Sequence, residues 1–130
     1  FGPLVALATD YQGAIDDKES ALYPLLTNAA KKSYWVPVRV ENKFSAGTPD
    51  LFIFRGAEYF VLECKVCRRK KFSNILTDLH WQPGQLHFFQ LSLQHALPYC
   101  LVVRHQQKLI FVMEERVNAL YDYPDIVRRW

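Results

Sequence analysis

The segment from Gly47 to Lys65 constrains the fold of this chain more than any other part of its sequence. It reads GTPDLFIFRGAEYFVLECK, and its two runs of β-branched and aromatic residues, 51–55 and 58–66, have the composition of β-strands. Gly56 can occupy the first central position of a two-residue turn between them. The pattern therefore predicts a β-hairpin in which Arg55 pairs with Glu58.

This register brings three charged side chains together at one end of the hairpin. Counting back from the turn, Asp50 lies directly opposite Glu63, and residues paired in this way share one face of the sheet, with Cβ atoms about 5 Å apart. Lys65, two residues after Glu63, points to the same side because side chains alternate along a strand. Two carboxylates beside an ammonium group can hold Mg²⁺ and activate water for phosphodiester hydrolysis.

Each of these residues also has a purely structural explanation. Asp50 is a common turn residue, and Glu63 could form an ion pair with Lys65 without any chemistry. A buried carboxylate with no partner would cost several kcal/mol in an apolar strand. For Asp50 and Glu63 taken together, a bound metal is therefore the better explanation.

The same residues resemble the signature of the PD-(D/E)xK nuclease superfamily, with Pro49-Asp50 followed by Glu63-Cys64-Lys65. The form Gly-x-Pro-Asp-Leu, followed by an apolar strand that ends in Glu-x-Lys, is most similar to the virus-type replication-repair nuclease (VRR-NUC) domains. The archaeal-type Holliday junction resolvases are close relatives of that group. Gln85-x-x-Phe88-Phe89, followed by Ala96, is similar to the Gln-x-x-Trp-Leu helix that follows the lysine in VRR-NUC proteins. The resemblance covers about residues 15–113.

The resemblance implies a magnesium-dependent endonuclease in which Mn²⁺ can substitute. Asp50 and Glu63 would be metal ligands, together with the backbone carbonyl of Cys64 and a carboxylate on the first helix, Glu19. Lys65 would position the attacking water and stabilise the charge that develops on the phosphate. Hydrolysis in this family leaves a 5′-phosphate and a 3′-hydroxyl.

Two candidate site residues have alternatives that the sequence leaves open. Glu19 lies at the capping-box position of a helix whose N-cap would be Asp16, and it also falls in line with the apolar stripe of that helix. Glu41, just after the first strand, is the rival third carboxylate. Gln85 is either a solvated residue near a helix N-terminus or, as the resemblance implies, a catalytic-site partner of Lys65 or of a metal-bound water.

Basic residues follow the acidic pair closely. Beyond Lys65 there are four in succession, namely Arg68, Arg69, Lys70 and Lys71, although the net charge of the whole chain is only +3. Such a cluster beside a metal site suits the phosphate backbone of DNA, and Arg39 and Lys43 are further candidates for phosphate contacts. A solvated loop is the alternative explanation for a run of like charges.

The composition favours one intracellular domain. The 130 residues are enough for a sizeable core, so we expect a single nuclease domain over residues 1–130. Half of the residues are hydrophobic, yet no apolar run has the length of a membrane span and no signal peptide is visible. Three cysteines disfavour a secreted disulfide framework. Cys64-x-x-Cys67 lacks the further ligands that a zinc site needs, and Cys64 alternates toward the apolar face of its strand.

The remaining elements complete an α/β fold. We expect a helix over 17–30, a strand over 34–40, a helix over 83–96, strands over 98–104 and 109–113, and a short helix over 114–121. Residues 1–14 show no clear periodicity. The order α-β-β-β-α-β-β predicts a mixed central sheet with helices on both faces, and it is also the order that the nuclease resemblance implies, a restriction-endonuclease-like fold. Both faces of the hairpin are apolar, which predicts that both are covered.

The residues and the resemblance together predict a magnesium-dependent DNA endonuclease. No groove-reading motif is evident, so selectivity is expected to come from the shape of the DNA. The resolvase relatives imply branched substrates such as four-way junctions. Paired cuts in a junction require two symmetric sites, hence a two-fold homodimer with an aromatic contact around Phe88-Phe89 or Trp130. The alternatives are a nuclease for flaps or nicks and a catalytically silent DNA-binding module of the same fold.

Overall fold

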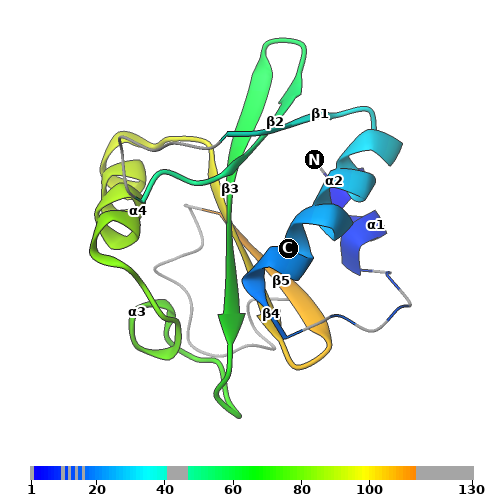
Figure 1. Ribbon diagram of the computed structural model, residues 1–130. Helices are drawn as coiled ribbons and strands as arrows, with labels where there is room; N and C mark the ends of the chain where they lie inside the picture. The colour runs from blue at the N-terminus through cyan, green and yellow to red at the C-terminus, as the bar shows by residue number, and fades with distance from the viewer. Residues whose placement is uncertain are drawn as a thin grey trace.

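A computed structural model describes residues 2–9, 11, 13, 15, 17–40 and 47–113. Within these residues five strands form one sheet in the order β1-β2-β3-β4-β5 (Figure 1). The strands are β1 (Val36–Arg39), β2 (Leu51–Arg55), β3 (Glu58–Cys67), β4 (Tyr99–His105) and β5 (Lys108–Met113). Neighbouring strands are antiparallel except for β3 and β4, which are parallel. The mixed sheet expected from the sequence is confirmed.

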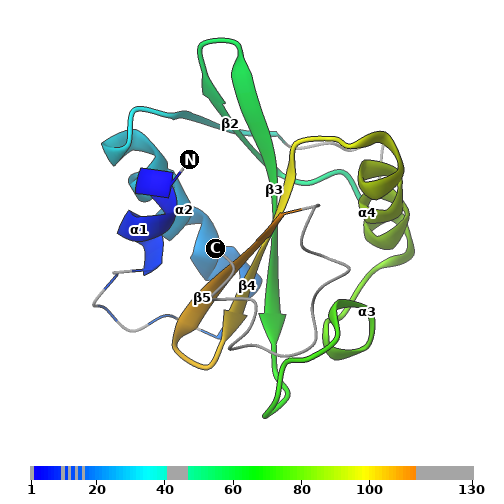
Figure 2. The ribbon, with the colours of Figure 1, turned by 180° about the vertical axis from the view of Figure 1, so that it is seen from behind.

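Helices pack on both faces of this sheet (Figure 1 and Figure 2). One face carries α1 (Gly2–Thr9) and α2 (Leu22–Lys32), and the other carries α3 (Ile75–Asp78) and α4 (Pro83–His95), which lie in the crossover from β3 to β4. The alternation of β3 divides the core in two, because Leu62 and Cys64 pack under α1 and α2 whereas Cys67 packs under α3 and α4. Residues 61–67 of β3 are all buried, as expected for a strand covered on both sides.

Coverage of the hairpin is incomplete, which corrects one expectation. The β2–β3 turn projects beyond the helices in both views (Figure 1 and Figure 2), and Phe54 and Tyr59 beside it are 37% and 42% exposed. Their rings stack on each other, with centroids 6.2 Å apart. The core cluster beneath α4 takes residues from β3, β4 and β5 but none from β1 or β2. Helix α4 therefore does not cover the turn end of the hairpin.

The expected aromatic contact around Phe88-Phe89 is also wrong in part. Phe89 is only 2% exposed and packs against Trp81 and Tyr99 in the core beneath α4, while the Phe88 ring lies against Tyr99. Phe89 is therefore a core residue and not part of a contact surface. Trp130 and the helix expected over 114–121 lie outside the described residues.

The bounds of the first two helices differ from the prediction, and both helices contain a proline in their first turn. Pro24 has no N–H to donate to the carbonyl four residues earlier, so it is tolerated only in a first helical turn. Accordingly α2 begins at Leu22 rather than at residue 17, and a 3₁₀ turn, η1 (Glu19–Ala21), precedes it. Helix α1 was not predicted because residues 1–14 show no clear periodicity; its Pro3 lies in the first turn, where proline is compatible with a helix.

Candidate active site

The candidate site lies where β2 begins and its pairing with β3 ends. Leu51 pairs with Leu62, so the predicted register is present and Asp50 is the next residue outward, opposite Glu63. The carbonyl of Asp50 accepts a hydrogen bond of 2.8 Å from the amide of Val40, which holds this end of β2 against β1. Beyond this point η1, instead of β2, lies against β3. The end of β2 therefore opens a space beside the middle of β3.

Three carboxylate residues line that space, a cavity of about 390 Å³. Asp50 and Glu63 reach it from the hairpin, and Glu19 reaches it from η1. The start of α4 supplies Gln85 to the same wall. Four residues that the sequence placed in one site thus share a cavity, although they come from separate elements.

Glu63 is a buried acid with an altered proton affinity. It is 4% exposed. Burial raises the pKa of its carboxyl group to about 7; the charge of Lys65 opposes this rise, and the carboxylates of Glu19 and Asp50 add to it. The cavity therefore favours a proton, or another cation, on this oxygen pair near neutral pH.

Lys65 is a buried base held by neighbours on three elements. It is 2% exposed, and its Nζ donates a 2.5 Å hydrogen bond to Oε1 of Gln85. The same Nζ lies 3.8 Å from Glu63 and 3.9 Å from Glu19. It also lies 5.1 Å from the centre of the Trp81 ring, a distance at which a cation–π attraction acts. These partners compensate for the water that a buried ammonium group loses.

Glu19 is the first residue of η1 and not the third, so it does not occupy the capping-box position that the sequence allowed. Lys18 is at the N-cap position of η1 and makes no side-chain cap hydrogen bond, and the expected cap, Asp16, lies outside the described residues. The Glu19 carboxylate is directed to the cavity and to Lys65. Its rival as third carboxylate, Glu41, is also outside the described residues, as is Lys43.

Gln85 is fixed by the first turn of α4. It is the third residue of a capping box: its Oε1 accepts a 3.2 Å hydrogen bond from the amide of Gln82, as well as the bond from Lys65. Gly47 packs directly on this turn, because a Cβ built on it would overlap backbone atoms of Gly84 and Gln85. Gly47 also has a φ of +95°, a conformation that favours glycine. The loop before Asp50 and the start of α4 are thereby held together.

Arg39 and Tyr23 form another part of the cavity wall. The Arg39 guanidinium lies 4.2 Å from the centre of the Tyr23 ring. Burial and the nearby Cys64, Glu63 and Asp50 raise the pKa of the Tyr23 hydroxyl far above its ordinary value, so it remains a proton donor. The sequence identified Arg39 but not Tyr23, whose place on the buried stripe of α2 gave no sign of a second role.

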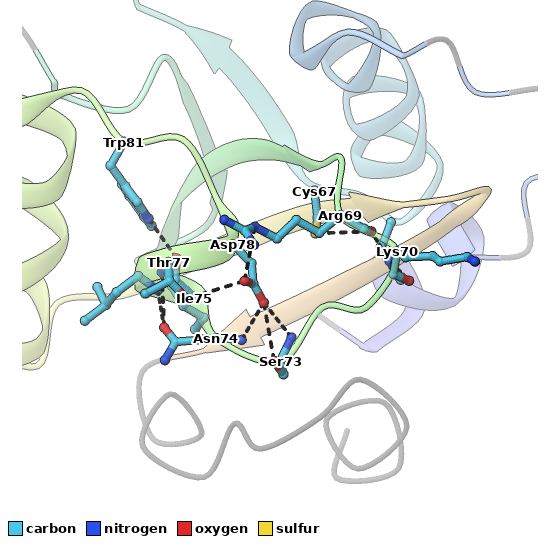
Figure 3. A network of polar contacts seen from close by, with 11 residues as sticks. Cys67, Arg69, Lys70, Ser73, Asn74, Ile75, Thr77, Asp78 and Trp81 are labelled. Atoms are coloured by element: carbon cyan, nitrogen blue, oxygen red, sulfur yellow. Dashed lines mark hydrogen bonds and ion pairs between the residues drawn. The ribbon is translucent and has the colours of Figure 1, made fainter.

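The basic segment after β3 is exposed, as a solvated loop would be, but two of its residues have acidic partners. Nη1 of Arg68 donates a 2.5 Å hydrogen bond to Asp17, and Nε of Arg69 lies 3.5 Å from Asp78. Figure 3 shows the Arg69 side chain directed to Asp78 and the Lys70 side chain directed away from it. Lys70 and Lys71 are exposed. Two of the four charges are therefore partly neutralised within the chain.

The cysteines contribute no thiolate site. Cys64 and Cys67 pack in cores on opposite faces of the sheet, and both are free thiols. Burial raises the pKa of the Cys64 thiol well above its ordinary value. A ligand role for its backbone carbonyl stays a prediction.

The donor set of the cavity fits magnesium better than a transition metal. Carboxylate oxygens are hard donors, and Mg²⁺ keeps several waters and uses only one or two protein carboxylates. Asp50 and Glu63 are two carboxylates of this kind on one cavity. Among the described residues, no group of three or more His, Cys, Asp or Glu residues is placed to hold a metal ion.

No protein-family model matches the chain, and no curated protein or solved structure matches it significantly. The likeness to the PD-(D/E)xK nucleases therefore rests on the motif residues and stays a prediction. In the part of the chain that the structure describes, no helix is both long and apolar enough to cross a membrane.

Proposed function

We propose that this chain is a metal-dependent DNA endonuclease of the PD-(D/E)xK type, with a restriction-endonuclease-like fold, that hydrolyses phosphodiester bonds in branched DNA. The observation that carries the proposal is the convergence of Asp50, Glu63 and Glu19 on one cavity beside the buried ammonium group of Lys65. A merely structural ion pair needs one acid for one base. Three acids beside one buried lysine supply the charge for a further cation.

Asp50 and Glu63 would hold Mg²⁺ or Mn²⁺, assisted by the backbone carbonyl of Cys64, and Glu19 would add negative charge to the cavity. When bound, the metal would activate water and stabilise the departing oxygen of the phosphodiester. Glu63 must give up its proton to serve as a ligand. Because its pKa is about 7, metal binding should release a proton below that pH and become tighter as the pH rises toward it.

Lys65 would orient the attacking water and stabilise charge on the phosphate from a fixed position. Its hydrogen bond to Gln85 and its burial restrict the ammonium group to one place, 3.8 Å from Glu63. A positioned cation can orient the nucleophile and stabilise charge on the phosphate without rearranging during the reaction. Gln85 would act as a positioning residue through Lys65.

The DNA would be bound through its phosphates. Arg39 lies on the cavity wall, and the segment from Arg68 to Lys71 continues directly from β3 beyond Lys65. Lys43 remains a candidate from sequence alone. These contacts recognise charge rather than base sequence, so selectivity would come from the shape of the DNA.

A two-fold homodimer would supply the two sites that paired cuts in a junction require. The exposed apolar side chains near the β2–β3 turn offer a contact surface on one face of β1, β2 and β3: Val36, Val38, Phe54 and Tyr59. If this face joins two copies, Val38→Lys should convert a dimer to a monomer in light scattering while its circular dichroism stays unchanged. A wild-type chain that is monomeric at assay concentration would contradict the dimer.

The function is tested with labelled four-way junctions, flaps, nicked duplexes and linear duplexes, each with Mg²⁺ and with EDTA. We expect magnesium-dependent cleavage, fastest on junctions. Asp50→Ala should abolish cleavage and leave DNA binding intact or slightly tighter, since it removes a negative charge. Glu58→Gln, on the partner strand of the same hairpin but at the distant turn, serves as the control and should cleave normally. Undiminished cleavage by Asp50→Ala would remove the assigned active site.

A further inference from the structure

A second pocket, of about 540 Å³, lies at the carboxyl ends of β3 and β4, beyond the candidate active site. Its charged lining consists of four cations and one acid: Arg68, Arg69, Lys70, Arg104 and Asp17. This lining has a net charge of +3, from four positive side chains and one negative. The sequence had indicated the first three of these cations, but neither Arg104 nor Asp17.

Arg104 differs from the other cations of this pocket because it is buried. It is 8% exposed, and its Nη1 donates a 3.0 Å hydrogen bond to Asp17. Its Nε hydrogen is buried and has no acceptor among the described residues. A buried donor without an acceptor is unfavourable, and more so on a charged group. Arg104 therefore lines the pocket as a nearly buried guanidinium group, one of whose hydrogens Asp17 does not satisfy.

Asp17 places an internal carboxylate between two guanidinium groups. Its side chain, 60% exposed, accepts from Nη1 of Arg68 at 2.5 Å and from Nη1 of Arg104 at 3.0 Å. Its carbonyl accepts from Nη2 of Arg68 at 3.3 Å. Paired guanidinium groups have the geometry to bind an oxyanion such as phosphate through several hydrogen bonds.

We propose that this pocket binds a phosphate group of the DNA strand that enters the active site, and that the Asp17 carboxylate holds the place of that phosphate when DNA is absent. The assignment of the phosphate to DNA rests on the proposed function, whereas the binding of phosphate in this pocket does not. Arg68 and Arg104 are its main ligands, because Arg69 is directed to Asp78 instead (Figure 3).

The two sites are close enough to share one strand. Asp17 lines the phosphate pocket and Glu19, two residues later, lines the catalytic cavity. On β3, Cys67 lines the phosphate pocket two residues beyond Lys65, which is about 7 Å along a strand. Successive phosphates of one DNA strand are separated by about 3.4 Å along the duplex axis. A strand with one phosphate beside Lys65 thus brings a nearby phosphate to the end of β3, where Arg68 and Arg104 line the pocket.

The test uses the full chain in EDTA, so that it does not depend on cleavage. Asp17→Asn removes the competing carboxylate, and Arg68→Gln removes one ligand; both side chains are largely exposed, so both variants should fold. The remote pair at the hairpin turn supplies controls of equal charge change, Glu58→Gln and Arg55→Gln. Thermal unfolding is followed with inorganic phosphate and with chloride at equal ionic strength. DNA affinity is measured at several salt concentrations.

We expect phosphate, and not chloride, to raise the Tm of the wild type, to raise that of Asp17→Asn more, and to raise that of Arg68→Gln less. The slope of log affinity against log salt should steepen by about 0.9 in Asp17→Asn and flatten by about 0.9 in Arg68→Gln, with both controls unchanged. Equal effects of phosphate on all variants would overturn the pocket and leave only an ion-pair network. A normal phosphate response with unchanged DNA slopes would overturn the DNA assignment. If the phosphate and salt responses are as expected but the chain cleaves none of the DNA substrates, the phosphate pocket is supported and the nuclease function is contradicted.

Discussion

Replacing Glu63 by Gln tests whether the cavity disfavours a negative charge, which is the electrostatic basis of a metal site. The pKa of Glu63 rises from 4.5 to about 7 on folding, mainly through burial. Each unit of pKa corresponds to about 1.36 kcal/mol, so ionising this carboxyl costs the folded state about 3 kcal/mol at most. Glutamine keeps the shape and cannot ionise.

The direction of the pH dependence follows from the raised pKa. The folded chain binds the Glu63 proton more tightly than the unfolded chain does, so this contribution to stability is fully present below pH 4.5 and is lost as the pH rises through about 7. We therefore expect the free energy of unfolding of Glu63→Gln, relative to that of the wild type, to increase between about pH 5 and about pH 8.5. In urea unfolding with EDTA this increase should be most of about 3 kcal/mol.

Controls separate this effect from general changes in stability. Glu58→Gln alters a carboxylate that is 63% exposed on the same strand, and it serves as the control of equal charge change. Adding Mg²⁺ at the higher pH should stabilise the wild type more than Glu63→Gln, because a bound ligand stabilises only the state that holds it. A difference between Glu63→Gln and the wild type that is independent of pH would refute the reasoning, since Glu63 would then titrate normally.

Two further predictions concern the contacts that position the site. Gly47→Ala should cost about 3 kcal/mol in urea unfolding and reduce cleavage, because the new Cβ overlaps the first turn of α4 as well as straining a positive φ. Gly56→Ala, with a φ of +59° but open space around it, should cost only about 1 kcal/mol; equal losses would show that the close packing is unimportant. Gln85→Ala should cost about 2 kcal/mol by removing the acceptor of the buried Lys65, whereas Gln90→Ala on the exposed side of α4 should be nearly neutral. Equal stabilities of the two glutamine variants would argue against this acceptor role.

The hairpin could be predicted closely because its information is local. A two-residue turn at Gly56 sets the pairing of Arg55 with Glu58, and the period of two along each strand then determines every later pair. Asp50 opposite Glu63 follows from that register. The helix from Pro83 was recognised for a similar reason, since its proline and its apolar spacing lie within a few turns.

The completed site depends on contacts between distant segments. The sequence allows Glu19 to be either a helix cap or a site residue. The contact of η1 with β3, beyond the end of β2, is what places Glu19 in the site. Arg104 appeared to be an ordinary strand end, and its partner Asp17 lies 87 residues away in the sequence. No local pattern encodes such a meeting, because it depends on how α2 packs across the sheet. Backbone propensity and alternation therefore account for the strands and for the pairing that brings Asp50 to Glu63. The packing of the N-terminal segment on the sheet adds Glu19 to that cavity and Asp17 to the two guanidinium groups of the phosphate pocket.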